Sequence, residues 1–220
     1  NAHVKENFVY ISHYTTGLKV IDIYDPNNPV EVAAFDTYPQ NDDGGFYGCW
    51  GAFPFTNNSF VYASDMQNGL FVLEHNKKRA GWMYGKVYDY SSQSISGYKL
   101  KSITNLKEYQ ADDENYFIGH PEGIHQFELI FNNEVIDELT LEFFGHETIE
   151  NNIYLNNPNF VEGDINQDQV ADILDVVLLV NIILGQNTPT AIESILSDIN
   201  GDSLINIQDI ILLVNLILSF

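Results

Sequence analysis

The pattern of apolar and polar residues divides the chain into three parts. In residues 1–76, short runs that alternate apolar and polar residues are separated by turns rich in Gly, Asn, Asp and Pro, which predicts β-hairpins. Residues 81–157 contain further alternating runs and indicate an antiparallel β-sandwich. In residues 161–220 the pattern changes to two longer apolar runs, Ile173–Leu184 and Ile210–Leu218, each of which follows an acidic loop. We therefore expect a multidomain, mainly β fold that ends in a small α-helical part.

The first part contains an internal repeat at an offset of 52 residues. Phe8–Ser12 and Gly17–Val20 align with Phe60–Ser64 and Gly69–Val72. The run GLKVIDIYDPNNPVEVAAFDT resembles the LVIVD repeat, and with YASDMQNGLFVLEH it resembles the β-propeller of choice-of-anchor B proteins. The resemblance implies partial propeller blades. Two blades cannot close a ring, because propellers typically have about four to eight. We expect a truncated propeller, and the alternative is that the blades pair with another chain.

The second part carries four short motifs: Gly85-Lys86-Val87-Tyr88-Asp89, Ile95-Ser96-Gly97, Asn115-Tyr116-Phe117 and Gly145-His146-Glu147-Thr148. In this order they resemble a carboxypeptidase regulatory-like, or transthyretin-like, domain. That resemblance implies a non-catalytic β-sandwich over residues 81–157. Asn115 and His146 depart from the Gly and Tyr of the family pattern.

Two acidic loops of equal length, Asp164–Asp175 and Asp198–Asp209, carry oxygen side chains at loop positions 1, 3, 5, 9 and 12. Calcium takes roughly six to eight oxygen ligands, and a tight loop can present alternate side chains to it. Position 7 can supply a backbone carbonyl, and a carboxylate at position 12 is favoured by the N-terminus of the following helix. The predicted ligands of two calcium ions are Asp164, Asn166, Asp168, Val170, Asp172 and Asp175, and Asp198, Asn200, Asp202, Leu204, Asn206 and Asp209.

The loops differ from an EF-hand, because position 12 is Asp rather than Glu and position 6 is Gln169 or Ser203 rather than Gly. The duplicated D-x-N-x-D, followed in both copies by LLVN, resembles a type I dockerin over residues 161–220. That resemblance implies a cohesin-like protein or a cell-surface scaffold as partner. It also implies recognition through loop positions 10 and 11, which are Ile173, Leu174, Ile207 and Gln208. Because three of these four are apolar, an apolar partner surface and packing on the neighbouring sandwich are both open.

The charge of the chain limits its partners. All nine Lys and Arg residues lie at or before Lys107, while residues 108–220 hold 21 of the 31 acidic residues and the net charge is −22. A nucleic-acid binder needs a basic surface, so no nucleic-acid partner is expected. No apolar run reaches about 18 residues, so no membrane span is expected. The single cysteine, Cys49, allows no internal disulfide and no thiolate zinc site.

No residue is marked as catalytic. His120, Glu122 and His125 could form a metal site, but in an extended strand residues five apart face opposite sides. No nucleophile-elbow pattern is present, and nothing marks a pair of opposed carboxylates.

The leading hypothesis is a secreted bacterial protein, extracellular or attached to the cell surface, that serves assembly rather than catalysis through a calcium-loaded dockerin. One alternative is an extracellular enzyme that degrades polysaccharide or protein and whose catalytic part lies upstream. The other alternative is a surface protein whose dockerin-like module packs within the chain as a cap.

Overall fold

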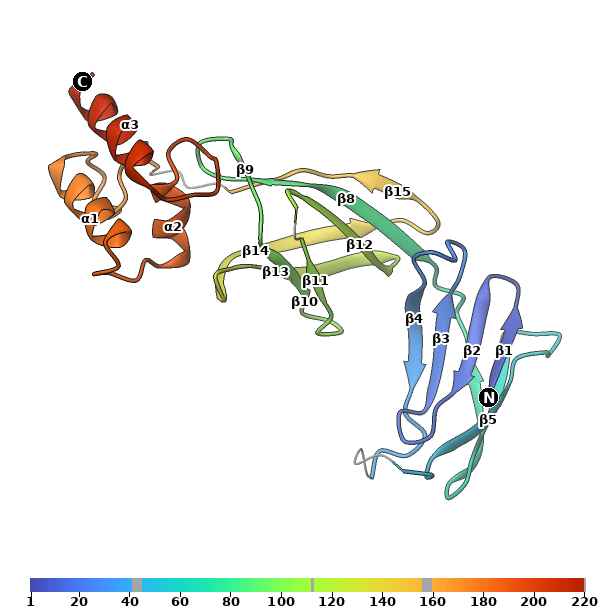
Figure 1. The fold of residues 1–220 in the computed structure, drawn as a ribbon. Coiled ribbons are helices and arrows are strands. Elements are labelled where there is room, and N and C mark those ends of the chain that lie inside the picture. The colour runs from blue at the N-terminus through green and yellow to red at the C-terminus, as the bar shows by residue number, and fades with distance from the viewer. Residues whose placement is uncertain (41–44, 112, 156–159, 220) are drawn as a thin grey trace. The chain divides into compact units, whose positions relative to one another are not determined.

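The structure is a computed structural model that describes residues 1–40, 45–111, 113–155 and 160–219 (Figure 1). It is mainly β, with several antiparallel sheets and a small helical region near the C-terminus, which confirms the predicted fold class. The chain forms two compact units. Unit 1 contains Asn1–Met83, Ile118–Ile124 and Glu142–Ile149; unit 2 contains Tyr84–Phe117, His125–Leu141 and Glu150–Phe220.

Two antiparallel sheets, in the orders β1-β2-β3-β4 and β5-β6-β7, make up most of unit 1. Alternate residues along their strands are buried, because one face of each sheet packs against the other sheet. The shared core includes Val30 and Val32 from the first sheet and Ala52 from the second, with Ala80 and Trp82 beside them. The strands are β1 (Ala2–Lys5), β2 (Phe8–Ser12), β3 (Leu18–Asp22), β4 (Val30–Phe35), β5 (Cys49–Phe53), β6 (Phe60–Asp65) and β7 (Gly69–Glu74).

The two copies of the 52-residue repeat bury opposite faces of their sheets. We call the face of β1–β4 that carries Phe8, Tyr10, Leu18 and Val20 its front face, and it packs against β5–β7. The same repeat positions in β5–β7 form the front face of that sheet, and they are exposed: Leu18 is 4% exposed and its equivalent Leu70 is 66% exposed. The second sheet instead buries its back face, which carries Val61, Ala63 and Leu73. The two sheets are thus stacked front to back.

Asp22, at the end of β3, contacts two segments of unit 1 that come later in the sequence, around Ala80 and His146. Its carboxylate is fully buried and accepts hydrogen bonds from the Ala80 backbone N–H at 2.9 Å and the Tyr24 backbone N–H at 2.8 Å. His146 Nε2 lies 3.0 Å from the same carboxylate, and the His146 ring stacks on Tyr24 with centroids 3.8 Å apart. A buried carboxylate is stable only when such partners replace water.

The middle of the chain forms two further sheets. One has the order β11-β10-β13-β14, and the other has the order β12-β8-β15, with β9 and β16 also paired to β8. Large side chains from both are fully buried, among them Tyr98, Leu100, Ile118 and Phe127. The strands are β8 (Ala80–Tyr88), β9 (Ser94–Ile95), β10 (Lys99–Ser102), β11 (Glu108–Gln110), β12 (Asn115–Pro121), β13 (Gly123–Phe131), β14 (Glu134–Phe143), β15 (Thr148–Glu150) and β16 (Ile153–Tyr154).

Three helices follow: α1 (Ile173–Ile183), α2 (Ala191–Ser197) and α3 (Ile207–Leu218). Their small core is centred on Ile165, Leu179 and Leu213, all fully buried. Helices α1 and α3 are those expected after the two acidic loops. Helix α2 was missed, because its apolar positions are too few to form a long periodic run. Its signal was the capping box of Thr190 and Glu193, in which each side chain accepts a hydrogen bond from the other residue's backbone N–H.

Candidate metal centre

The first loop is held closed by its own side chains. The Asp164 carboxylate accepts hydrogen bonds from the backbone N–H groups of Asp168 (3.0 Å) and Gln169 (2.7 Å). Asn166 Oδ1 also accepts from the Asp168 N–H at 2.9 Å, and Asp168 Oδ1 accepts from the Val170 N–H at 3.0 Å. Short polar side chains that bond the backbone two residues ahead stabilise tight turns without any other partner. The sequence of this loop therefore specifies its own shape.

The second loop repeats this pattern residue for residue. Asp198 accepts from the N–H groups of Asp202 (3.1 Å) and Ser203 (2.8 Å). Asn200 Oδ1 accepts from the Asp202 N–H at 2.9 Å, and Asp202 Oδ1 accepts from the Leu204 N–H at 2.9 Å. The Leu204 carbonyl also accepts from Asn206 Nδ2 at 3.1 Å. The duplication seen in the sequence is thus a duplication of local geometry.

The carboxylates at position 12, Asp175 and Asp209, connect each loop to its helix. Asp175 accepts from the N–H groups of Asn166 (3.0 Å) and Asp172 (2.9 Å), and Asp209 accepts from those of Ile199 (3.0 Å) and Asn206 (2.8 Å). Asp172 and Asn206, at position 9, are the N-caps of α1 and α3, and each forms a capping box with the Asp at position 12. Position 12 therefore lies in the first helical turn, as expected from the spacing.

The two loops concentrate buried negative charge. Asp175 and Asp209 are fully buried and Asp164 is nearly so, yet no Lys or Arg follows Lys107 in the sequence. Burial raises the pKa of Asp198, the neighbouring carboxylates of Asp209 and Asp202 raise it further, and backbone N–H groups of Ser203 and Asp202 partly oppose them. Burying a carboxylate is costly unless a partner of opposite charge is present. A bound cation would supply that partner.

The donor sets suit calcium. Each loop offers carboxylate, amide and carbonyl oxygens, which are the ligands of hard cations, and no thiolate or imidazole that would favour a transition metal. In the described part of the chain, no three His, Cys, Asp or Glu side chains are gathered around a point that could hold a metal ion. The loop carboxylates instead accept the backbone hydrogen bonds given above. Calcium would add to these bonds, because a carboxylate that accepts two N–H bonds still has lone pairs free.

Two positions in each loop adopt the left-handed backbone region, which disfavours residues other than Gly. They are positions 4 and 6: Gln167 (φ 61°) and Gln169 (φ 75°) in the first loop, and Gly201 (φ 67°) and Ser203 (φ 66°) in the second. The first loop thus holds two strained residues and the second holds one. The sequence pattern drew attention to position 6 alone.

The predicted recognition residues lie at the starts of α1 and α3. Ile173, Leu174 and Ile207 are each more than half exposed, and Gln208 is exposed as well. They are therefore accessible and do not contribute to the helical core.

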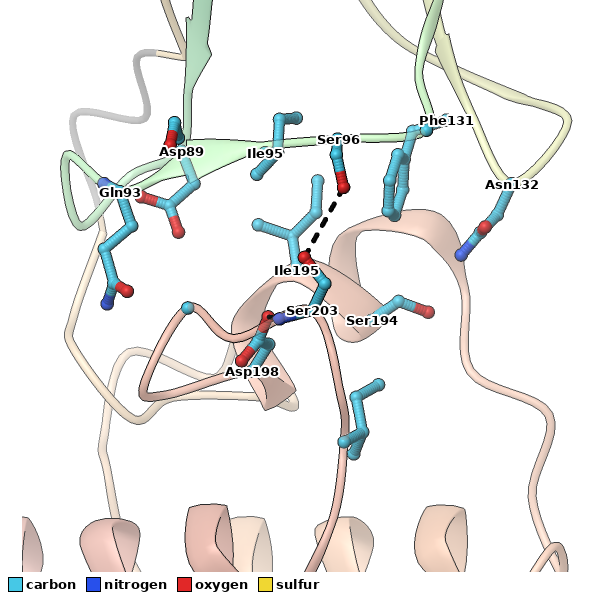
Figure 2. A pocket seen from close by; sticks show the side chains of 14 residues that line it. Asp89, Gln93, Ile95, Ser96, Phe131, Asn132, Ser194, Ile195, Asp198 and Ser203 are labelled. Carbon is cyan, nitrogen blue, oxygen red and sulfur yellow. Dashed lines mark hydrogen bonds between the residues drawn. The ribbon is translucent and has the colours of Figure 1, made fainter. Parts of the chain in front are cut away.

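A pocket in unit 2 lies beside the second loop (Figure 2). Ser96 Oγ lies 3.4 Å from Ser203 Oγ, and Gln93 Nε2 donates to the Ile199 carbonyl at 3.1 Å. The Glu134 carboxylate also accepts from the Ala191 N–H at 2.9 Å. Sequence reasoning did not find these contacts, because they join residues more than 50 positions apart that share no motif. The pocket is lined by Asp89, Gln93, Ser94, Ile95, Ser96, Gly97, Phe131, Asn132, Ser194, Ile195, Asp198, Gly201, Ser203 and Ile205.

Comparison with protein families agrees with this geometry. Residues 162–218 match the dockerin type I domain. We refer to these residues as the dockerin domain. Residues 1–37 match the LVIVD repeat. The predicted resemblances to a type I dockerin and to the LVIVD repeat are thereby confirmed. Type I dockerin domains bind calcium, a dockerin implies a cohesin partner, and proteins that bear this domain are typically extracellular.

No curated protein matches the chain. Among solved structures, the Bacillus anthracis TIE protein matches with 11% identity and a TM-score of 0.29. That match covers 43% of this chain and 22% of the other chain, so it spans less than a quarter of the other chain's length.

Several expectations stay predictions. They are the division into residues 1–76, 81–157 and 161–220, the carboxypeptidase regulatory-like resemblance, the individual calcium ligands and the recognition residues.

The three residues considered as a metal site, His120, Glu122 and His125, come from neighbouring segments. His120 lies in β12 and His125 in β13, and Glu122, between these strands, accepts a hydrogen bond from the Arg79 N–H at 3.2 Å. Among the described residues, no helix is long and apolar enough to cross a membrane.

Proposed function

We propose that this chain is a secreted, non-catalytic assembly protein that binds a cohesin-like partner through a calcium-loaded dockerin domain. The observation that supports it best is the pair of loops with equal hydrogen bonding, whose buried carboxylates have no basic residue in the same domain. An ion is the simplest source of the missing positive charge. The match to the dockerin type I domain supports the cohesin-binding assembly role.

Two calcium ions are proposed, one in each loop. The first would be held by Asp164, Asn166, Asp168, the Val170 carbonyl, Asp172 and Asp175, and the second by the equivalent residues of Asp198–Asp209. The ion supplies positive charge and no reactivity. The residues of the chain keep the loops closed around it, because their backbone hydrogen bonds already draw positions 1 and 12 towards the middle of the loop. The ordered loop then presents the first turn of α1 or α3.

The partner would contact these first turns. Ile173 and Leu174 are exposed apolar side chains at the start of α1, and Ile207 is one at the start of α3, where Gln208 adds a group that can both donate and accept hydrogen bonds. Large apolar side chains exposed at the ends of ordered loops are available to a protein partner. We therefore propose a partner with an apolar contact surface.

Calcium titration calorimetry of the chelator-stripped chain tests the metal part. We expect two ions per chain, and one ion in each of Asp175→Ala and Asp209→Ala. A chain that takes up no calcium would overturn the proposal. Asp137→Ala, in β14, is the matched control, because it removes a carboxylate outside both loops and should leave two ions bound.

Pull-down with a panel of cohesin modules, in calcium or in EGTA, tests the partner. We expect retention in calcium only, and its loss in Ile173→Asp/Ile207→Asp. Leu184→Asp is the control, because Leu184 is as exposed as Ile173 but follows the far end of α1. Equal retention in EGTA, or equal loss with Leu184→Asp, would contradict recognition through the calcium loops.

A second function is favoured by hydrogen bonds between the dockerin domain and other residues of unit 2: Gln93 Nε2 donates to the Ile199 carbonyl, and the Ala191 N–H donates to Glu134. In this alternative the dockerin domain packs within unit 2 as a stabilising cap. Gln93→Ala/Glu134→Ala would then lower the melting temperature of the helices, which circular dichroism at 222 nm follows because the described helices all lie in residues 173–218. Unchanged melting together with calcium-dependent cohesin retention would leave assembly as the function.

A further inference from the structure

Gln93 connects the strand part of unit 2 to the second loop of the dockerin domain. Its Nε2 donates a hydrogen bond to the Ile199 carbonyl at 3.1 Å, and its side-chain amide lies against Gly201. A second, longer contact joins Ser96 Oγ and Ser203 Oγ, which are 3.4 Å apart (Figure 2). Residues from outside the dockerin domain thus contact positions 2, 4 and 6 of this loop.

The Gln93 side chain is presented by a tight turn between β8 and β9. The buried Asp89 carboxylate accepts hydrogen bonds from the backbone N–H groups of Ser91 at 2.9 Å and Gln93 at 2.7 Å. The Asp89 N–H donates to the Gln93 carbonyl at 2.8 Å. An Asp side chain that bonds the backbone ahead of it stabilises such a turn without any other partner. Gln93 therefore approaches the second loop from an ordered turn.

The hydrogen bond from Gln93 acts on the peptide group between Ile199 and Asn200. The C=O of this peptide accepts from Gln93, and its N–H donates to the Asp209 carboxylate at 3.4 Å. The Ile199 N–H also donates to Asp209, at 3.0 Å. Asn200 and Asp209 are predicted calcium ligands at positions 3 and 12. Gln93 thus helps to fix the backbone from which the Asn200 side chain extends.

The first loop has no such support. Among the described residues, no side chain from outside the dockerin domain hydrogen-bonds to residues 164–175. Position 4 of the first loop is Gln167, whereas in the second loop it is Gly201, where a Cβ would meet the Gln93 amide. Gly at this position therefore allows Gln93 to approach the second loop closely. The two loops have the same internal bonds but different neighbours.

We propose that Gln93 is a positioning residue for the second calcium ion and does not affect the first. The inference rests on the calcium part of the proposed function. A loop whose backbone is already ordered loses less conformational freedom when it closes around an ion, so it binds that ion more tightly. Coupling of this kind is reciprocal, so calcium in the second loop strengthens the contact with Gln93 by the same factor.

Calcium titration calorimetry of single-site variants of the full chain tests the proposal. Asp175→Ala leaves the second site intact, and Asp209→Ala leaves the first. Adding Gln93→Ala to Asp175→Ala removes one hydrogen bond and should weaken binding of the remaining ion by about three- to tenfold. Adding it to Asp209→Ala should leave the affinity for the remaining ion unchanged. Gln93→Met should act like Gln93→Ala, because Met keeps the length of the side chain but has no donor.

Gln126→Ala is the matched control, because Gln126 lies in β13 of the same unit and its side chain accepts a hydrogen bond from Thr140 rather than contacting a loop. It should leave both sites unchanged. Circular dichroism at 222 nm in saturating calcium shows that each variant is folded. The same result should appear without the ligand variants, since Gln93→Ala alone should weaken one of the two ions.

The outcomes separate this inference from the proposed function. A chain that binds two ions, with affinities that Gln93→Ala leaves unchanged, would overturn the role of Gln93 and leave the proposed function intact. Equal weakening of both ions would do the same, because it would show a general loss of stability. A wild type that binds no calcium would overturn both.

Discussion

The two internal repeats of this chain behave differently when they fold. The carboxylates and amides at positions 1, 3 and 5 of the two dockerin loops accept the same backbone hydrogen bonds, and both position-12 carboxylates are fully buried. The two sheets of unit 1 share a strand pattern just as clearly, yet their equivalent positions have opposite burial. Leu18 and Val20 are core residues, whereas Leu70 and Val72 are exposed.

The difference lies in where the specifying interactions come from. Each loop is closed by hydrogen bonds between residues two to ten positions apart, so its sequence alone dictates its shape. A sheet face is buried only if another sheet lies on it, and that depends on the neighbours in space. Equal sequences therefore give equal loops but need not give equal burial.

The largest test compares two equivalent leucines. Leu18→Ala should lower the free energy of unfolding of unit 1 by about 2–5 kcal/mol, because it leaves a cavity between the sheets. Leu70→Ala should change it by roughly 0.5 kcal/mol or less, because Leu70 is exposed. Trp82 is buried in the same core, so its fluorescence during denaturant unfolding reports both variants. Equal losses would show that the front face of β5–β7 is covered in solution.

Equivalent loop residues should instead respond alike. In EGTA, Asp175→Ala and Asp209→Ala each leave two partly buried backbone N–H groups without their acceptor, at about 1 kcal/mol per group. Helical circular dichroism should show similar losses for the two variants, and calcium should restore less stability to either than to wild type. Markedly unequal losses would contradict the equivalence of the two loops.

The left-handed positions provide a smaller test. Gln167→Gly should stabilise the calcium-free dockerin domain by about 1 kcal/mol, because Gly adopts a positive φ without a steric penalty. Gly201→Gln should have the opposite effect, and it would also displace the Gln93 side chain, which lies against Gly201. Thermal melting at 222 nm measures both. A destabilising Gln167→Gly would show that the side chain contributes more than its backbone strain costs.

The smallest expected effect is on pH dependence. Burial lowers the pKa of His75, Lys77 lowers it further, and Asp22 and Glu6 act in the opposite direction. His75 Nδ1 is hydrogen-bonded to the buried Tyr10 hydroxyl at 2.9 Å. The stability that neutral His75 contributes is present above its unfolded pKa of about 6.5 and is lost as the pH falls towards the lowered value.

His75→Gln should therefore flatten the dependence of unit 1 stability on pH between about 7 and 5. The Trp82 unfolding transition at several pH values measures it. His13→Gln is the control, because His13 is exposed and lies outside the core, and an equal flattening by that variant would refute the assignment to His75.

Much of the molecule could be predicted from the sequence by itself. The alternation of residues 8–12 and 60–64 was sufficient to predict strands, and the duplicated acidic spacing was sufficient to predict both loops, their helices and position 12 in the first helical turn. These features depend on contacts a few residues apart, whose geometry the side chains specify directly. Helix α2 was present as a capping box but lacked the long apolar periodicity that makes a helix conspicuous.

Which copy of the repeat buries its front face could be learned only from the tertiary structure. The same holds for the contacts of the Asp22 carboxylate with the Ala80 N–H and with His146, which lie more than 50 positions away in the sequence. The tertiary structure also decided that Gln93, Ser96 and Glu134 meet the dockerin domain. The physical reason is common to all three. Burial and long-range hydrogen bonds are properties of surfaces that come together, and residues with the same local pattern acquire different roles according to what lies against them. The shape of the calcium loops is determined by nearby residues in the sequence. Which face of each sheet is buried is determined by how the two sheets pack.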